Sequence, residues 1–247
     1  MKRYLLIALL FCFAIQAEAQ SGWQMRLMPQ VAFGTRNTVQ RPNNEEGTRI
    51  FLNDDYNRKH KASFSPRIEL KYNYKRHYVI LTAAWVSDSF EGVAKEDVLY
   101  DRVLFATGSP IEADYSFNTY RLGYRYRIVE RPRFNFELGA TLLLRDAYIS
   151  LEDRDKKAKF SNVGVAPLLS YYIEWKATER LSLLSYGDAF AVKAGRAEDV
   201  FAGAKYQITP MISATAGYRL LEGGSDSDRV YTMSAFHFLS MGIGVEF

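Results

Sequence analysis

The last nine residues, Leu239-Ser240-Met241-Gly242-Ile243-Gly244-Val245-Glu246-Phe247, alternate large apolar side chains with small or polar ones. Successive side chains of a β-strand point to opposite faces, so this period of two predicts a strand with one apolar face. The same alternation recurs along the chain, for example at 120–126, 134–144 and 163–175. Most of these segments equal or exceed the ~9–11 residues that a tilted strand needs to cross a bilayer. The sequence therefore predicts long transmembrane strands that turn their apolar face to lipid.

The pattern predicts an all-β fold, a closed antiparallel up-and-down barrel of ten transmembrane strands. The expected strands lie at 23–35, 61–74, 77–88, 113–129, 134–151, 160–175, 180–193, 198–208, 211–221 and 229–247. Eight strands would result if one hairpin is misread, and twelve if Ile50–Asn53 or Val98–Ala106 form strands of their own. Closure is expected because every backbone N–H and C=O in lipid needs a partner. A soluble β-sandwich is the competing fold, but it would leave much Tyr, Leu and Val facing water.

The connections between these strands alternate in length. Tight turns are expected at 75–76, 130–133, 176–179 and 209–210, and longer polar connections at 36–60, 88–112, 152–159, 194–197 and 222–228. Short turns on one side and longer loops on the other are typical of outer-membrane barrels. An even number of strands then predicts that both termini lie on the periplasmic side.

The beginning of the chain predicts export. Lys2 and Arg3 precede an apolar run at 4–15, and Ala17-Glu18-Ala19 has the small-x-small pattern of a cleavage site. The run is shorter than the ~20 residues of a membrane helix, although a retained anchor is the alternative. We therefore expect a signal peptide at 1–19, cleaved after Ala19, and one barrel domain at 20–247 in the cell outer membrane. The only cysteine, Cys12, lies inside this segment, so the mature chain has no thiol chemistry.

The leader, the alternating strands and the terminal Phe247 together resemble the small outer-membrane β-barrel proteins of Gram-negative bacteria. This resemblance covers the whole chain. It implies that the last strand, which ends in Phe247, is recognised by the barrel-assembly machinery. Shorter strings at 120–126 and 217–219 are similar to those of exported barrels that carry no assigned activity. The resemblance therefore implies an architecture and a location, and it implies no reaction.

Charge composition limits the classes of partner. The chain has 32 basic and 28 acidic side chains, and this near balance gives no strong attraction to nucleic acid. Strand parity also separates the interleaved Arg and Tyr of 115–127 onto opposite faces, so we expect no nucleic-acid partner. We expect a monomer in contact with outer-membrane lipids and lipopolysaccharide. Basic side chains in and beside the first loop could contact lipopolysaccharide phosphates or be mobile surface charge: Arg36, Arg41, Arg49, Arg58, Lys59 and Lys61.

Charged residues on the inward parity predict a polar lumen. The set is Arg67, Glu69, Lys71, Arg121, Arg125, Arg127, Glu137, Arg145, Glu174, Lys205, Arg219 and Glu246, with Asp188 a weaker member because its strand alternates poorly. If they pair, these charges would plug a narrow barrel, because unpaired buried charges are costly. The alternative is a narrow polar pore for small solutes, or a pocket for an anionic ligand, in which the excess of Arg gives selectivity.

A barrel enzyme that acts on lipid A, phospholipid or peptides at the outer rim is the second hypothesis. The rim candidates are Arg196, Asp199, Glu222, Asp226 and Asp228. His237 and Ser240 lie three residues apart on one strand, so they point to opposite faces and cannot form a hydrolase pair. A protease resembling the omptins needs an Asp–His pair, but the sequence has no Asp-x-His, and only His60 lies near acidic residues, Asp54 and Asp55. We therefore expect no catalytic residues and a non-enzymatic role, either structural in the envelope or in narrow, porin-like transport.

Metal and cofactor signals are weak. His60, His77 and His237 lack metal-ligand spacing. The acidic segments 152–155 and 226–228 could meet Ca²⁺ through their carboxylates, but neither matches a complete calcium loop. We therefore expect no metal and no cofactor.

Overall fold

The computed structural model describes residues 21–193 and 195–247. The predicted signal peptide and its cleavage site after Ala19 lie outside the described residues. Among the described residues, no helix combines the length and the apolar character that a membrane crossing requires.

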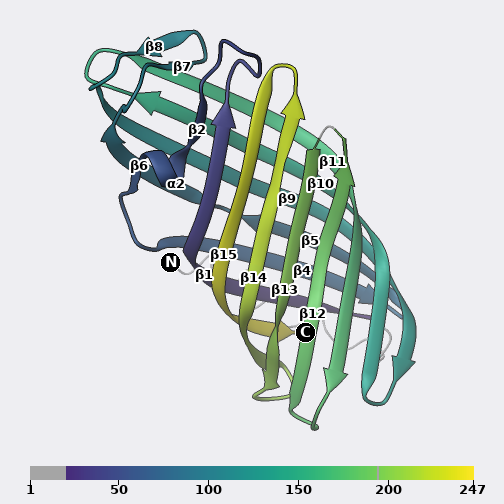
Figure 1. Ribbon diagram of the computed structural model, residues 1–247. Coiled ribbons are helices and arrows are strands. Elements are labelled where there is room, and N and C mark those ends of the chain that lie inside the picture. The colour runs from purple at the N-terminus through teal and green to yellow at the C-terminus, as the bar shows by residue number, and fades with distance from the viewer. Residues whose placement is uncertain (1–20, 194) are drawn as a thin grey trace, which may run out of the picture.

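The described residues form ten long strand paths, one of which consists of two strands in succession, β5 and β6 (Figure 1). Their bounds are β1 Ser21–Gln40, β4 Ser63–Tyr74, β5 His77–Ala84, β6 Ser87–Val93, β9 Pro110–Arg131, β10 Phe134–Glu152, β11 Lys157–Lys176, β12 Leu181–Val192, β13 Gly195–Gln207, β14 Ile212–Ser227 and β15 Val230–Glu246. Each of the ten segments predicted from the alternation overlaps one of these paths, so the predicted strand count is confirmed.

The sheet closes into an antiparallel barrel. Each path pairs with its sequence neighbours, β1 pairs with both β4 and β15, and β9 pairs with β10 as well as with β5 and β6. At the junction of first and last strands, Trp23 N–H donates to the Phe247 carbonyl at 2.7 Å, and Phe247 N–H donates back at 2.8 Å. Closure leaves no free sheet edge at this junction, as a structure in lipid requires.

The two segments that might have added strands lie outside the barrel wall. Residues 50–53 contribute to β2 (Arg49–Phe51) and α2 (Leu52–Asp55), and β3 (Asn57–Arg58) follows. Residues 98–106 contain β7 (Val98–Tyr100) and β8 (Val103–Phe105), which form a separate two-stranded sheet. All of these short elements cluster at one end of the barrel (Figure 1).

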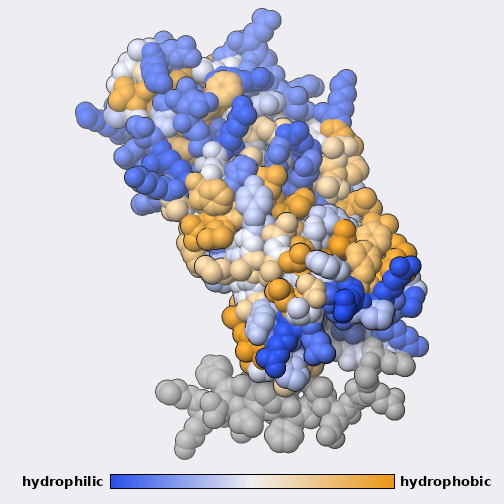
Figure 2. Space-filling view, turned by 60° about the horizontal axis from the view of Figure 1, so that its bottom comes forward, coloured by the Kyte–Doolittle hydropathy of each residue, from blue (hydrophilic) through white to orange (hydrophobic). Residues whose placement is uncertain are grey.

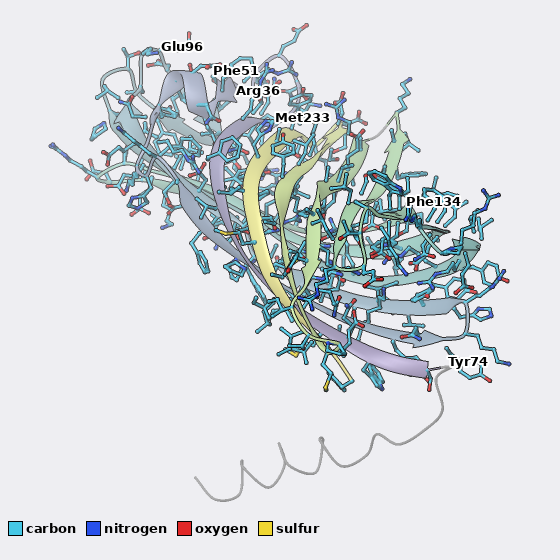
Figure 3. All side chains as sticks on the ribbon, turned by 90° about the horizontal axis from the view of Figure 1, so that it is seen from below. Arg36, Phe51, Tyr74, Glu96, Phe134 and Met233 are labelled. Atoms are coloured by element: carbon cyan, nitrogen blue, oxygen red, sulfur yellow. The ribbon has the colours of Figure 1, made fainter. Side chains whose placement is uncertain are left out.

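The two ends of the barrel differ as the sequence predicts. Short turns and both described chain ends lie at one end, and the long connections at 41–62 and 94–109 lie at the other, which we call the inner and the outer end. Tyr74, beside a short turn, and Glu96, in a long connection, mark these opposite ends in Figure 3.

All five predicted long connections are wrong in extent, because strand also occupies 36–40 in the first of them and 88–93 and 110–112 in the second. Half of segment 152–159 is strand, because β10 and β11 remain paired as far as Glu152 and Lys157. Likewise β13 begins at Gly195, and β14 continues to Ser227. The strands outgrow the ~9–11 residues that a bilayer needs, and beyond the apolar belt their polar residues stay hydrogen-bonded in the sheet while facing water.

The outer surface of the barrel is apolar in its middle. Large apolar side chains remain exposed on every barrel path, and Figure 2 shows hydrophobic surface between two hydrophilic ends. Exposed aromatic residues gather toward the inner end: Trp23, Tyr74, Tyr126, Phe134, Trp175 and Tyr206. An apolar band with an aromatic girdle is the outward face of a transmembrane barrel, because aromatic rings favour the membrane–water interface.

Close packing inside the barrel depends on two paired glycines. Gly203 of β13 lies opposite Gly217 of β14, and the buried ring of Phe201 lies across both. A Cβ on Gly217 would lie 2.7 Å from the tip of that ring and 2.4 Å from the carbonyl oxygen of Ala202. Since backbone cannot move aside as a flexible side chain can, no larger residue fits here.

We therefore expect Gly217→Ala to lower the free energy of unfolding by about 1–3 kcal/mol, the usual cost of overpacking. Gly164→Ala is the matched control, because a Cβ there would meet only the Asn162 amide, at 3.9 Å. Urea unfolding in lipid vesicles, followed by tryptophan fluorescence, measures both. Equal stability of the two variants would show that the contact at Gly217 is dispensable.

Candidate functional site

The lumen contains many charged side chains. Strand parity turns alternate residues inward, and most of the predicted lumen residues are buried there: Arg67, Glu69, Arg121, Arg125, Glu137, Glu174 and Arg219. The side chains of Asp188 and Lys205 are also largely shielded from solvent. Lys71, Arg127, Arg145 and Glu246 lie on the same inward parity and are partly exposed.

Asp199 is the centre of this network. Arg219 binds it with two parallel hydrogen bonds, from Nε to Oδ1 at 2.6 Å and from Nη2 to Oδ2 at 2.8 Å. Arg67 donates to Oδ2 at 3.0 Å, and Arg121 donates to the same oxygen. Three guanidinium groups therefore share one carboxylate, and the bidentate pair is the strongest geometry available to such groups.

The predicted position of Asp199 at the rim is wrong. The sequence pattern starts its strand at residue 198, which places Asp199 beside the outer connection. Because β13 begins at Gly195 and pairs Asp199 with Asp188 of β12, the carboxylate lies within the barrel and is 4% exposed.

Further ion pairs extend the network from Asp199. Glu69 lies 3.6 Å from Arg26 and 3.8 Å from Arg67. Asp188 lies 3.7 Å from Arg121 and accepts a hydrogen bond from Thr141. Arg26 was absent from the predicted set, although Gln24, Arg26, Met28 and Gln30 share the inward parity of β1 and are all buried. Strict use of the alternation would have found it.

A second group of charges lies nearer the inner end. Glu137 pairs with Arg127 at 3.0 Å and with Arg125 at 3.5 Å. Glu174 pairs with Lys205 at 2.7 Å and accepts a hydrogen bond from Asn135. At the mouth, Gln24 donates to Glu246 at 2.7 Å.

The middle of the lumen is closed. A void of about 20 Å³ remains among Arg67, Arg121, Arg125, Asp188 and Asp199. This is close to the ~10–15 Å³ that a single water requires. Beside it the aromatic rings of Tyr172, Tyr186 and Phe201 stack on one another and are buried.

Two spaces lie on either side of this closed layer. Toward the inner end, a polar vestibule of about 460 Å³ is lined by Lys71, Arg127, Glu174, Lys205 and other residues. Toward the outer end, an apolar cavity of about 360 Å³ borders Arg145 and Leu143. The charged layer separates the two.

An apolar core fills much of the outer end. Leu52 of α2, Tyr100 of β7 and Phe105 of β8 are fully buried in one cluster with Phe90 and Phe236 of the barrel wall. The outer connections are therefore folded against the barrel mouth, where they cover its inward-facing aromatic residues.

In the same connections, the Thr107 N–H and hydroxyl both donate to Asp97, which holds the pKa of that carboxyl below its usual value.

The remaining rim candidates do not form one site. Arg196 pairs with Glu222 on neighbouring strands. Asp226 accepts a hydrogen bond from Asn43 of the first connection, and Asp228 is exposed in the turn after β14. The acidic segment 152–155 forms its own turn, in which Asp153 accepts backbone N–H groups of Asp155 and Lys156.

Histidines lie away from acidic clusters. His237 and His77 face outward and hydrogen-bond to the Tyr218 and Tyr124 hydroxyls respectively. His60 is exposed in the first connection. Within 21–193 and 195–247, no group of three or more His, Cys, Asp or Glu side chains is arranged to hold a metal ion.

Comparisons with solved structures identify the kind of barrel. The outer-membrane protease OmpT of Escherichia coli superposes with a TM-score of 0.64 at 8% sequence identity, over 95% of this chain and 99% of that chain. The fold is that of an outer-membrane β-barrel. Ail of Yersinia pestis (TM-score 0.37, 14% identity, 92% and 99% covered) and Neisserial surface protein A (0.35, 14%, 90% and 97%) fit less closely. No family model matches the chain, and no curated protein matches it.

We expect Asp199→Asn to lower the free energy of unfolding by about 3–5 kcal/mol, because removing the carboxylate leaves the buried guanidinium groups without a counter-charge. Asp228→Asn removes an exposed carboxylate and is the control. Folded barrels migrate faster than unfolded ones in unboiled gels, so the temperature at which this shift is lost measures both variants. If Asp199→Asn keeps the wild-type temperature, the central ion cluster does not hold the barrel together.

Proposed function

We propose that this chain is a non-enzymatic barrel of the cell outer membrane, with a structural role in the envelope and a lumen closed by its own side chains. The observation that carries this proposal is the charged layer around Asp199, which leaves a void of about 20 Å³. The apolar outer belt supports the location, because such a surface is stable only in contact with lipid.

A narrow pore is the alternative within the same class. The excess of Arg in the lumen would favour anions. However, the guanidinium groups of Arg67, Arg121 and Arg219 are all engaged with one carboxylate, so a permeating ion would have to break buried ion pairs. The paired charges therefore favour a closed lumen over a pore.

The enzyme hypothesis has less support. OmpT is a protease, but identity of 8% conveys the fold alone. Catalysis at the rim would need an acid and a base within hydrogen-bond reach of each other. Here the rim carboxylates of Glu222 and Asp226 contact Arg196 and Asn43, and the described histidines bond to tyrosines or are exposed.

We also propose that the outer surface contacts lipopolysaccharide phosphates through two of the basic residues singled out in the sequence. Arg36 and Arg49 line an external groove of about 370 Å³ together with Tyr231 and Met233. Arg36, Phe51 and Met233 lie near one another at the outer end in Figure 3. The Arg49 guanidinium also lies 4.2 Å from the centre of the Tyr231 ring.

Three other basic residues of the first connection have partners within the protein. Arg58 pairs with Asp88 at 2.7 Å, Arg41 with Asp101 at 2.6 Å and Lys59 with Glu112 at 2.5 Å. They hold the outer connections in place. Arg196 also lines the groove but is paired with Glu222, which leaves Arg36 and Arg49 as the groove's cations without a carboxylate partner. Arg is suited to phosphate because its planar fork donates two parallel hydrogen bonds.

We expect the purified, refolded barrel to show no steady conductance in a planar bilayer across several salt concentrations, because the charged layer blocks the lumen. A general porin in the same bilayer is the positive control, and gel migration verifies folding. Steady anion-selective openings that weaken in Arg121→Ala would instead establish a pore and overturn the closed-lumen proposal.

We expect the double variant Arg36→Ser/Arg49→Ser to bind lipopolysaccharide about tenfold more weakly or worse, because each lost charge-assisted contact is worth about 1.5–3 kcal/mol. Arg131→Ser/Arg133→Ser removes two exposed Arg at the inner end and is the matched control. Thermal stabilisation by added lipopolysaccharide, measured at low and high salt, reports the affinity. Equal stabilisation of both double variants would rule out the groove.

A further inference from the structure

The barrel wall is incomplete between β11 and β12 in its outer half. β11 pairs with β10 over the whole length from Lys157 to Lys176, but with β12 only over its last eight residues, from Leu169 onward. Beyond the pair Leu169–Ala189, β12 pairs only with β13, as far as Val192 and Gly195. The outer part of β11 therefore has a free edge, where a closed barrel should have none.

Local sequence and burial both agree with this break. Pro167 lies two residues before Leu169 of the last pair, and a proline has no N–H to donate to a neighbouring strand. On the inner side of the break, inward-facing residues such as Ser170 and Tyr172 are buried. On its outer side, Asn162, Gly164 and Ala166 share the same face of β11 and are not buried. On β12, all residues of 189–192 are exposed.

The break opens at the depth of the outer half of the apolar belt. Val163 and Val165 on the outward face of β11 are each 63% exposed, and Val165 lies opposite the exposed Leu144 of β10. The next outward residue on β10 is Asp146, opposite Val163, which marks the end of the belt. The opening thus faces lipid tails on its inner side and the membrane–water interface on its outer side.

Behind the break lies the apolar cavity of about 360 Å³. Its walls include Leu143, Val165, Pro167, Phe190 and Val192. The volume is near the lower end of the roughly 300–1,000 Å³ of ligand pockets. This size suits one hydrocarbon chain better than a lipid with several.

Arg145 is the charged residue of this cavity that lacks a counter-charge. The guanidinium lies 3.9 Å from the centre of the Phe117 ring, and its buried Nε and Nη2 atoms have no hydrogen-bond partner. Among the described residues Arg145 forms no salt bridge, whereas Arg196 at the same cavity is paired with Glu222. A cation held in apolar surroundings without a partner is costly, so an anion beside it would be strongly favoured.

We propose that this cavity binds a long-chain carboxylic acid that enters from the bilayer through the break between β11 and β12. The hydrocarbon chain lies along Pro167 and Phe190, and the carboxylate pairs with the Arg145 guanidinium near the interface. Because the cavity has one unpaired cation, Arg145, and room for one hydrocarbon chain, it favours a ligand with a single chain and a single negative charge. This binding goes beyond the structural role, and it needs no open lumen, because the charged layer lies below the cavity.

The test is the binding of palmitate to the full-length refolded protein in phosphatidylcholine nanodiscs, measured by displacement of fluorescent cis-parinarate. We expect Arg145→Gln to weaken palmitate binding about tenfold or more, because a charge-assisted contact is lost. Binding of the uncharged hexadecanol should be equal in the wild type and in Arg145→Gln. The control is Arg133→Gln, an exposed Arg at the inner end, and it should bind palmitate as the wild type does.

A second variant tests the cavity itself. Ala166→Trp places a large side chain in the unpaired part of β11, where it should fill the cavity and abolish binding of both palmitate and hexadecanol. Gly164→Leu serves the same purpose if the first variant does not fold, as judged by gel migration. The proposal is overturned if folded wild type binds no palmitate, if Arg145→Gln binds it equally well, or if filling the cavity changes nothing. Tighter binding of lysophosphatidylglycerol than of palmitate would overturn the assignment to a carboxylate and indicate a phosphate headgroup.

Discussion

The need of every backbone N–H and C=O for a partner in lipid governs this structure. It explains why the sheet closes and why the last residues pair with the first strand. The same constraint makes the gap between β11 and β12 notable. A free edge at membrane depth is tolerated where it is buried in protein or lines a water-filled cavity, whereas the free edge of β11 borders an apolar cavity.

Closure creates a narrow interior that has to be filled, and the chain fills it in two ways. The middle and inner parts contain paired charges centred on Asp199, Glu137 and Glu174. The outer part contains an apolar core to which the long connections contribute Leu52, Tyr100 and Phe105. Charged pairs hold one geometry because breaking them leaves buried ions without partners. Apolar packing instead accommodates connections that come from different parts of the chain.

This division gives the barrel its functional character. The charged layer separates the polar vestibule from the outer cavity, so the molecule is better suited to holding its place in the envelope than to conducting ions. The outer half keeps the features that could recognise other molecules. These are an external groove with Arg36 and Arg49, and a lipid-facing opening that leads to Arg145.

The alternation of side chains was sufficient to predict all ten strand paths and the inward position of residues such as Arg67, Glu137 and Arg219, because a strand has a strict period of two. The same rule would have placed Arg26. Strand ends were harder to predict, since a polar residue in a strand above the membrane resembles one in a loop, and this is why Asp199 was assigned to the rim. Tertiary structure alone decided that three Arg from β4, β9 and β14 meet at one carboxylate of β13. It also decided that the outer connections fold onto the mouth, and that β11 separates from β12 while Arg145 is left unpaired. These features depend on contacts between residues far apart in sequence, and a local pattern carries no information about such contacts.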